Sequence, residues 1–398
     1  RLESAGLLAD DRFELAFPDV RTLRITASPR SVKWALNHIL ETGAGVRWLF
    51  PGPAGTHWPD RADVAVPRRA EAREAAFGLQ RNLSYPIANW QINLNAKDEL
   101  RFNHELTVFA FPLDKYGPTQ SWPVDIMPVI KGQKKTTVDP KHARGGWQPC
   151  YSHPRTAAVA VENICAYLEA HPGARSVSLA VNDGGGFCEC EACRAAAGDP
   201  KRNSLNQPHY SEVYYAWANR VAESVSRRHP DVYFGCLAYR EVMDPPAFDL
   251  HPRLVPFLCF DTYSCLDPQV RSNRLEIARR WQERTPSGHW GHWDYSYSRP
   301  RLLLPRLYFK LQQDLMRQTH ERGARAMFVE AYPNASDGPA KYLYLKLMWD
   351  VNADIEALLD DWCAACLGDK AAPYLKRYFL DWEALWTDDA LYWVPAGG

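Results

Sequence analysis

Short apolar runs alternate with longer amphipathic segments from about residue 78 to residue 330 of the 398-residue chain. The runs have the length and composition of buried strands, and the segments between them repeat apolar residues every three to four positions, as helices do. Strand followed by helix, about seven times over, predicts an α/β fold with a parallel sheet that closes, or nearly closes, into a (β/α)8-type barrel. A doubly wound open sheet is the alternative. The expected strands are 78–83, 105–109, 176–181, 232–238, 254–260, 289–293 and 326–329, and the expected helices are 155–170, 209–229, 271–284 and 305–322.

Other segments flank or interrupt this alternation. Near the N-terminus, strand, helix and strand patterns at 21–26, 31–41 and 46–50 predict a compact unit. We therefore expect residues 1–70 to form a small α/β domain and residues 71–398 to form the catalytic barrel. The tail, residues 354–386, has a helical pattern without a further strand. Residues 115–146 are rich in proline, glycine and lysine and are expected to form a long active-site loop.

Aromatic content and charge narrow the class of partner. The chain holds 15 tryptophans and 19 tyrosines, and flat aromatic rings commonly stack against sugar rings. A tryptophan-rich core is the alternative. Lysine plus arginine and aspartate plus glutamate both number 47, so the overall charge lacks the basic excess typical of nucleic-acid binding. We expect a glycan or oligosaccharide partner and no nucleic acid.

Targeting and motif patterns exclude several protein classes. No run reaches the roughly 18 apolar residues of a membrane span. The chain opens at Arg1 without a methionine or a leader, so we expect a secreted or periplasmic protein whose signal has been removed, with a cytoplasmic location as the alternative. The absence of H-x3-H, G-x-S-x-G and P-loop motifs argues against metalloproteases, serine esterases and nucleotide enzymes.

Acidic residues follow the expected strands, where a parallel barrel carries its functional side chains. Glycoside hydrolysis needs one protonated carboxyl group and a second, ionised group. We expect Asp183, in a glycine-rich turn, and Glu330, after an apolar strand, to form this catalytic pair, with Asp294 as a competitor for either role. For each acid, a helix cap or a structural salt bridge is the alternative. The residues expected to bind substrate are Trp293, Tyr295, Tyr239, Arg240, Glu241, Asp261, Tyr263 and Arg81.

Three cysteines form the sharpest local motif. Cys188, Cys190 and Cys193 give the spacing C-x-C-x2-C, which suits a structural zinc site if Cys150 or a histidine supplies a fourth ligand. A disulfide or reduced thiols is the alternative. Because the motif begins shortly after Asp183, a metal there would hold the loop without taking part in catalysis. No cofactor is expected for the chemistry itself.

Several segments resemble known carbohydrate-active families. The segment RITASPRSVKWALNHILETGAGVRWLFPGPAGTHWP resembles the small domain that precedes the barrel in α-glucuronidases and family 20 hexosaminidases. The segments QPCYSHP, SVSLAVNDGGGFCECEACR, HWDYSYSRPRLLLP, GARAMFVEAYPN and YLYLKLMWDVNADIEALLDDWCAACLGDKAAPYLKRYF together resemble the bacterial domain of unknown function 4838. That group includes glycoside hydrolase family 163, the endo-β-N-acetylglucosaminidases that act on complex N-glycans.

The resemblance implies a retaining or substrate-assisted mechanism on a β-linked N-acetylglucosamine, with one carboxylate orienting the acetamido group and another acting as general acid. It carries Asp183, Asp294 with Tyr295, and Glu330 onto this chain. Residues 115–146 depart from the pattern, because relatives have a His-Pro-Glu-Tyr type segment there and this chain reads YGPTQSWPVDIMPVIKG. Two alternatives stay open: release of a uronic acid, with Arg81, Arg101 or Arg240 as the clamp, and a non-catalytic glycan-binding barrel.

Overall fold

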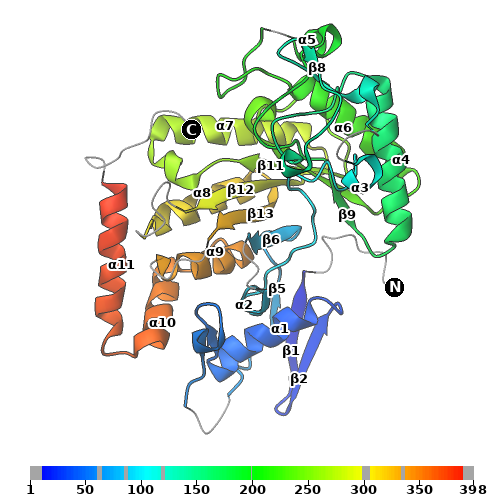
Figure 1. The fold of residues 1–398 in the computed structure, drawn as a ribbon. Coiled ribbons are helices and arrows are strands. Elements are labelled where there is room, and N and C mark those ends of the chain that lie inside the picture. Colours follow the sequence, from blue (N-terminus) through cyan, green and yellow to red (C-terminus); the bar gives the residue numbers. More distant parts are fainter. Residues whose placement is uncertain are drawn as a thin grey trace.

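A curled parallel sheet forms the centre of the computed structural model, which describes residues 11–60, 65–84, 88–117, 122–198, 200–297, 305–332 and 337–388. Its six strands lie in the order β6-β13-β12-β11-β10-β9, and all neighbours are parallel (Figure 1). Successive side chains of a strand point to opposite faces of the sheet, and here both faces are buried. The strands are β6 (Gln80–Leu83), β9 (Ser176–Ser178), β10 (Tyr233–Ala238), β11 (Leu254–Cys259), β12 (Trp290–Ser296) and β13 (Ala324–Ala331).

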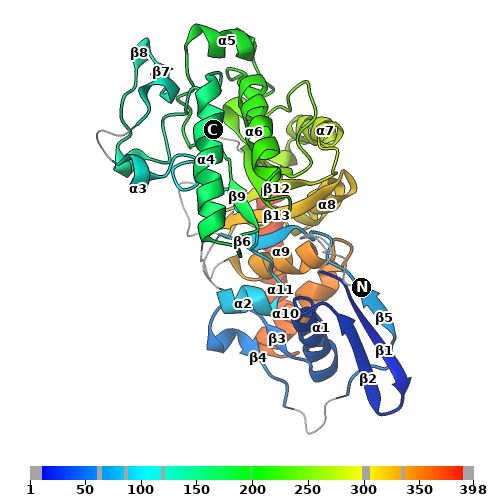
Figure 2. The ribbon, with the colours of Figure 1, turned by 90° about the vertical axis from the view of Figure 1, so that its right-hand side faces the viewer.

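Helices cover the outer face of this sheet. In β10, Phe234 and Cys236 belong to the outer core shared with the helices, whereas Tyr233 and Leu237 belong to an inner core enclosed by the curl. Figure 2 shows α4 and α6 side by side on this outer face. The helices between the N-terminal unit and the C-terminal tail are α2 (Ala88–Asn93), α3 (Leu113–Tyr116), α4 (Pro154–Ala170), α5 (Glu191–Ala197), α6 (Ser211–Ser226), α7 (Pro268–Arg284), α8 (Phe309–Glu321) and α9 (Ala340–Trp349).

The sheet is open between β6 and β9, because no strand joins them in the described residues. The strand expected at 105–109 is wrong, since these residues form turns. An irregular segment ahead of them crosses the gap instead: Gln80 Oε1 accepts from the Leu100 N–H at 2.9 Å, and Ser176 Oγ accepts from the Arg101 N–H at 2.8 Å. The parallel sheet is confirmed, and the described strands number six where the sequence predicts a ring of eight.

The bridging segment also fills the inside of the curl. Phe102 stacks on Phe257 with ring centroids 3.9 Å apart, and its edge meets Phe328 at 5.1 Å. Gly235 makes room for it, because a Cβ there would lie 2.3 Å from the Arg101 carbonyl oxygen. The inner core is therefore a packed plug and not a channel.

The N-terminal residues form a small antiparallel sheet, in the order β2-β1-β5, with helix α1 (Val32–Ile39) packed on it. Its strands are β1 (Phe13–Asp19), β2 (Thr22–Ala27) and β5 (Glu71–Arg73), so the unit extends past the boundary expected at residue 70. The strand expected at 46–50 shrinks to the two-residue β3 (Arg47–Trp48), which pairs with β4 (Thr56–His57). Trp349 of α9 joins the core of the unit.

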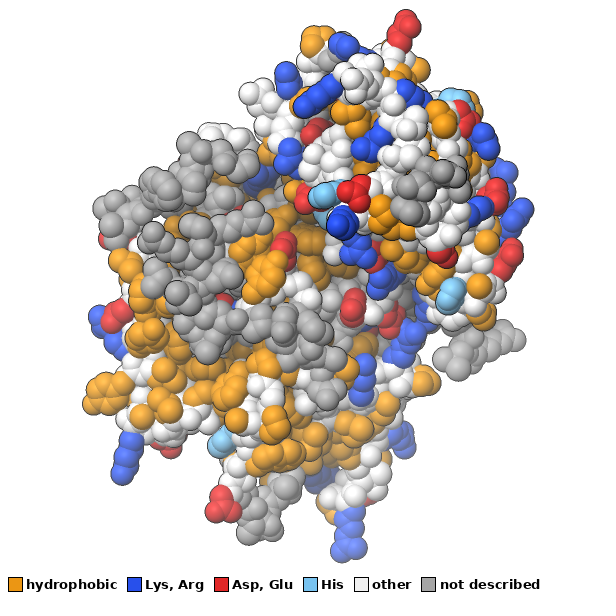
Figure 3. Space-filling view, in the orientation of Figure 1, with side chains coloured by type: hydrophobic (Ala, Val, Ile, Leu, Met, Phe, Trp, Pro, Cys, Tyr) orange, Lys and Arg blue, Asp and Glu red, His pale blue; other side chains and the backbone are white. Residues whose placement is uncertain are grey.

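The C-terminal tail and the long loop complete the described fold. The expected helical tail consists of α10 (Ile355–Leu367) and α11 (Ala372–Thr387). The long loop contains a small hairpin, β7 (Val129–Ile130) with β8 (Gln133–Lys134). Within the described ranges, no helix combines the length and apolarity needed to span a bilayer. The face drawn in Figure 3 mixes basic, acidic and hydrophobic side chains, in keeping with the zero net charge.

Candidate active site

Two strands run further than the sequence pattern indicates, and this decides where their side chains point. β12 continues to Ser296 and β13 to Ala331. Trp293 and Tyr295 therefore face the inner core, and Asp294, between them, faces the helices. Trp293 is buried against Phe328, with ring centroids 4.4 Å apart. It therefore lies beneath the rim, the edge of the sheet formed by the C-terminal ends of the strands.

Glu330 lies on the inner side of this rim. It is aligned with Tyr295 in the β12–β13 register, and aligned residues of parallel strands share a face. The Tyr332 hydroxyl donates to Glu330 Oε1 at 2.9 Å. Burial raises the pKa of the Tyr295 hydroxyl, and the neighbouring Tyr239 and Glu330 raise it further. Tyr295 therefore keeps its proton and can serve as a hydrogen-bond donor beside Glu330.

Asp183 lies across the rim in a turn that only glycines can form. Gly184, Gly185 and Gly186 have φ values of 75°, 77° and 76°, in the left-handed region that side chains disfavour. The Asp183 side chain is exposed, and the Tyr239 hydroxyl donates to its Oδ1 at 3.0 Å. Burial and the Asp183 carboxylate raise the pKa of Tyr239.

These contacts bring Asp183 and Glu330 to one rim. Tyr239, which bonds Asp183, and Tyr295, which is aligned with Glu330, both pack against the inner core. The row Asp183, Tyr239, Tyr295, Glu330 thus combines residues from the ends of β9, β10, β12 and β13. The catalytic roles of these two acids, which lie 147 positions apart (330 minus 183), stay a prediction.

Two hollows open beside this rim and share Asn103. The one at Asp183 has a volume of about 660 Å³, and its polar lining includes Lys135, Asp139, Lys141, His142 and Arg144. The one beside β6 has a volume of about 500 Å³, and its polar lining includes Asn82, Gln91, Asp98, Arg101 and Glu105. Sugar hydroxyls are recognised by polar groups of these kinds in clefts of this size.

His104 is a candidate residue that the sequence analysis missed. Its Nδ1–H donates to the Val181 carbonyl at 2.5 Å, because a carbonyl can only accept. Its ring lies 5.9 Å from the Tyr239 ring, and it lines the same hollow as Asp183. His104 stands just before the strand expected at 105–109, so the sequence analysis did not place it at a strand end.

Other residues that were expected to bind substrate are paired with residues of the chain itself. Arg240 forms an ion pair with Glu241, with Nε and Oε2 3.6 Å apart. Asp261 accepts two bonds from Arg306 Nη2, at 2.5 and 2.6 Å, and Arg306 also covers the Tyr263 ring at 4.4 Å. Burial raises the pKa of Asp261, and the Arg306 charge opposes this. Arg306 was not foreseen because it lies in the sequence after β12, far from its partner.

Asp294 corrects an expectation, because it is fully buried on the helix side of β12. Its carboxylate accepts from the Thr262 N–H at 2.8 Å, the Thr262 hydroxyl at 2.6 Å and the Tyr344 hydroxyl at 2.7 Å. The backbone N–H of Tyr295 adds a bond at 2.7 Å. These bonds hold the β11 loop and α9 to β12, so the structure gives Asp294 a supporting place instead of a place in the cleft.

We expect Asp294→Asn to lower stability and to spare turnover. The amide keeps the shape but turns a donor toward hydroxyls that already donate, which leaves buried groups unsatisfied. The free energy of unfolding, measured by urea titration, should fall by about 2–3 kcal/mol. At a temperature where the variant is folded, kcat should stay within about fivefold of the wild type, well short of the roughly hundredfold loss of an acid–base group. Asp231→Asn, at a side chain that is 82% exposed, is the matched control.

Arg81 corrects a second expectation. Its side chain is 1% exposed, and its Nη1 donates to Asp11 Oδ2 at 2.7 Å. The guanidinium lies over the rings of Trp34 and Trp349, at 4.5 and 5.0 Å. A buried, ion-paired group between the small sheet and the central sheet cannot reach a substrate, so Arg81 joins two parts of the fold.

The cysteine motif is brought together with the residue proposed as its fourth member. Sulfur atoms of Cys150, Cys188, Cys190 and Cys193 all lie within 4.8 Å of one another, and all four cysteines are free thiols. Cys150 comes from the turn before α4, and the other three come from the start of α5 and the loop before it. No histidine takes part in this described cluster.

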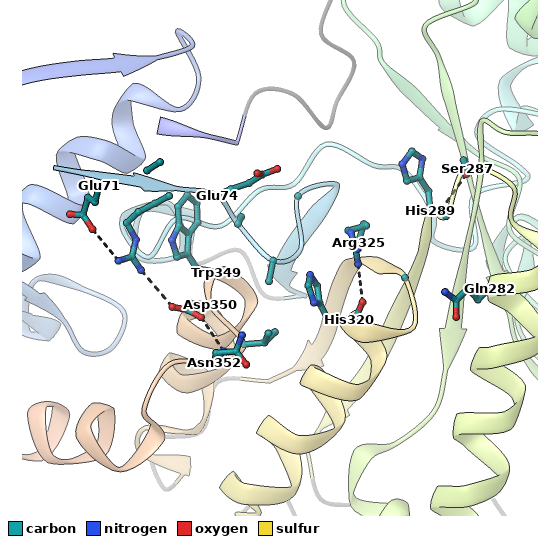
Figure 4. A pocket seen from close by; sticks show the side chains of 18 of the residues that line it. Glu71, Glu74, Gln282, Ser287, His289, His320, Arg325, Trp349, Asp350 and Asn352 are labelled. Carbon is teal, nitrogen blue, oxygen red and sulfur yellow. Dashed lines mark hydrogen bonds and ion pairs between the residues drawn. The ribbon is translucent and has the colours of Figure 1, made fainter. Parts of the chain in front are cut away.

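A larger cavity, about 920 Å³, lies at the other end of the strands (Figure 4). Two of its arginines already have protein partners: Arg73 Nη2 lies 3.7 Å from Asp350 Oδ2, and Arg325 Nη1 donates to the His320 carbonyl at 2.9 Å. Burial lowers the pKa of His320. Since functional groups of such sheets gather at the C-terminal ends of the strands, this cavity is a junction between the two parts of the fold.

The fold and the rim define a class of α/β proteins whose polar and acidic side chains gather at the C-terminal edge of a curled parallel sheet. Within that class, the chain belongs to the family described as a domain of unknown function, DUF4838, whose model matches residues 50–380. No curated protein matches the sequence at a significant level.

Solved structures of glycoside hydrolases share this fold. One is a family GH115 4-O-methyl-α-glucuronidase with specificity for decorated arabinogalactans, at a TM-score of 0.54 and 15% identity over 95% of this chain and 53% of that chain. Another is a family 89 glycoside hydrolase from Clostridium perfringens in complex with PUGNAc, at a TM-score of 0.52 and 10% identity over 95% of this chain and 49% of that one. The chain thus spans about half the length of these structures.

Proposed function

We propose that the protein is a glycoside hydrolase in which Asp183 and Glu330 act as the acid–base pair. The observation that carries the proposal is that Tyr239, which bonds Asp183, and Tyr295, which is aligned with Glu330, pack against the same inner core. The fold is one that glycoside hydrolases use. In this proposal the segment before His104 takes the place of a barrel strand.

We assign the general-acid role to Glu330 and the role of the ionised partner to Asp183. Glu330 is half-buried on the inner side of the rim, next to the Tyr332 hydroxyl. Asp183 is exposed in a hollow whose lining also includes Lys135 and Arg144. Both roles are needed to cleave a glycosidic bond.

The preferred sugar in this proposal carries a carboxylate. The Asp183 hollow has four basic residues in its lining, namely Lys135, Lys141, His142 and Arg144, and guanidinium and ammonium groups bind carboxylates strongly. An acetamido group instead needs an apolar pocket walled by tryptophan. Trp147 lines the Asp183 hollow but is buried, and no other tryptophan is among the described lining residues of either hollow. The cleft therefore favours the uronic acid alternative over a β-linked N-acetylglucosamine.

A panel of substrates tests the proposal. The wild-type chain should hydrolyse an aryl α-D-glucuronide or a uronic acid-bearing oligosaccharide faster than an aryl β-N-acetylglucosaminide or an N-glycoprotein. Arg144→Gln should raise KM for the uronide by about tenfold, the loss of one charge-assisted bond. Arg227→Gln, at the exposed residue that follows α6, is the control. Cleavage of N-acetylglucosaminides alone would overturn the sugar assignment. Sugar binding without turnover of any glycoside would favour the glycan-binding barrel.

A further inference from the structure

The four-cysteine cluster has the dimensions of a metal site. Zinc–thiolate bonds are about 2.3 Å long, so the sulfurs of a tetrahedral site lie about 3.8 Å apart. In the structure, Cys150 Sγ lies 3.7 Å from Cys190 Sγ and 3.7 Å from Cys193 Sγ. All six sulfur pairs fall within 4.8 Å. A disulfide brings only two sulfurs together, whereas here four converge on one point.

We propose that Cys150, Cys188, Cys190 and Cys193 bind one zinc ion as a closed, tetrahedral structural site. Tetrahedral sites of four thiolates hold zinc or iron, and zinc is the redox-inert choice for a site without an open position. Three of the four side chains are buried, and Cys190 is partly exposed.

Groups around the cluster support thiolate ligands. The Val129 N–H donates to Cys188 Sγ at 3.3 Å. The Ser152 hydroxyl oxygen lies 3.1 Å from Cys193 Sγ and 3.5 Å from Cys150 Sγ. Hydrogen bonds of this kind orient metal-bound sulfurs and offset their charge.

The site joins the two segments that form the Asp183 turn. The Gly146 N–H donates to the Asp183 carbonyl at 2.7 Å, and the Gln148 N–H donates to the Gly186 carbonyl at 2.9 Å. Cys150 and Cys188 follow directly after these paired segments. Zinc would therefore fix the two segments just beyond the hydrogen bonds that hold the Asp183 turn, and it would take no part in catalysis.

The hairpin of the long loop is attached at the same place. The Glu189 N–H donates to the Val129 carbonyl at 2.8 Å, and the Cys150 N–H donates to the Ile126 carbonyl at 2.7 Å. Figures 1 and 2 both show α5 and this hairpin at the end of the molecule opposite the small N-terminal sheet. Zinc in this proposal therefore ties the hairpin, α5 and the turn before α4 together at one point.

Metal analysis of the full chain tests the site without reference to turnover. Protein made in zinc-supplemented medium should contain about one zinc per chain by mass spectrometry, and cobalt replacement should give the visible absorption of a tetrahedral tetrathiolate. Cys188→Ser/Cys193→Ser should bring zinc to background. Cys366→Ser, a partly buried thiol of α10 outside the cluster, should keep it.

If the double cysteine variant does not fold, a measurement on the wild-type chain still tests the zinc site. Titration of the folded wild-type chain with a mercurial should release the zinc to an indicator dye, and four thiols should react as it leaves. Iron in place of zinc, no bound metal, unchanged zinc in the double variant or an intact mass that shows a disulfide among the four would each overturn the proposal. The effect of zinc loss on turnover rests on the proposed function, whereas zinc content does not, so the two proposals fail separately.

Discussion

Replacing Glu330 with glutamine is expected to lower kcat at least about a hundredfold, because the amide keeps the shape of the side chain but cannot deliver a proton. Asp183→Asn should cause a loss of the same order, since it removes the charge that stabilises the sugar cation. Sugar binding, measured by calorimetry, should change little in either variant. The two losses in the double variant should not add, because both residues serve one reaction.

Matched substitutions outside the rim are the controls for this experiment. Glu162→Gln on α4 changes a side chain that is 69% exposed, and Asp231→Asn changes one that is 82% exposed. Both should leave kcat unchanged. Turnover above half of the wild-type value in both Glu330→Gln and Asp183→Asn would remove these residues from the chemistry.

The buried ion pairs between the small sheet and the central sheet predict the second large effect. Asp11 accepts from Arg81 at 2.7 Å and from Lys97 at 3.1 Å, and none of the three side chains is more than 1% exposed. Asp11→Ala would leave two buried cations without their partner. The free energy of unfolding should fall by about 3–5 kcal/mol, with a clear drop in the melting temperature by calorimetry.

A compensated variant separates charge from packing. Asp11→Leu combined with Arg81→Met and Lys97→Met should recover much of the lost stability, because apolar groups of similar volume can replace a buried ion cluster. Asp231→Ala, at an exposed site, should change stability by no more than about 0.5 kcal/mol. An Asp11→Ala chain that unfolds at the wild-type temperature would show that the ion pairs do not support the junction.

Periodicity predicted the strands well where helices follow them directly. The expected strand at 254–260 matches β11 within one residue, and the expected helix at 155–170 matches α4 within one residue. Both elements are buried on one or both faces, so their apolar patterns record the packing. The segment at 105–109 failed because its apolar residues are buried in a turn, and burial alone does not distinguish a turn from a strand.

The catalytic roles of Asp183 and Glu330 stay predictions, and two other candidate residues were placed wrongly. Asp183 and Glu330 both lie at the C-terminal end of the sheet, because Glu330 is the last residue but one of β13 and Asp183 follows β9 in a glycine turn. Asp294 was misjudged because β12 continues to Ser296, and each further residue of a strand changes face. Arg81 was misjudged because its partner, Asp11, lies 70 positions away and the pattern of either segment alone does not show the pairing.

Local chemistry in the sequence therefore determined most strands and helices of the central sheet, that the sheet is parallel, and which residue types lie at the strand ends, because periodicity and turn residues act over short distances. Only the tertiary structure decided that Asp183 and Glu330 share a rim while Asp294 and Arg81 do not, and that Cys150 completes the cysteine cluster. These outcomes depend on contacts between residues far apart in the chain, whose side-chain directions follow from where each strand ends and what packs against it.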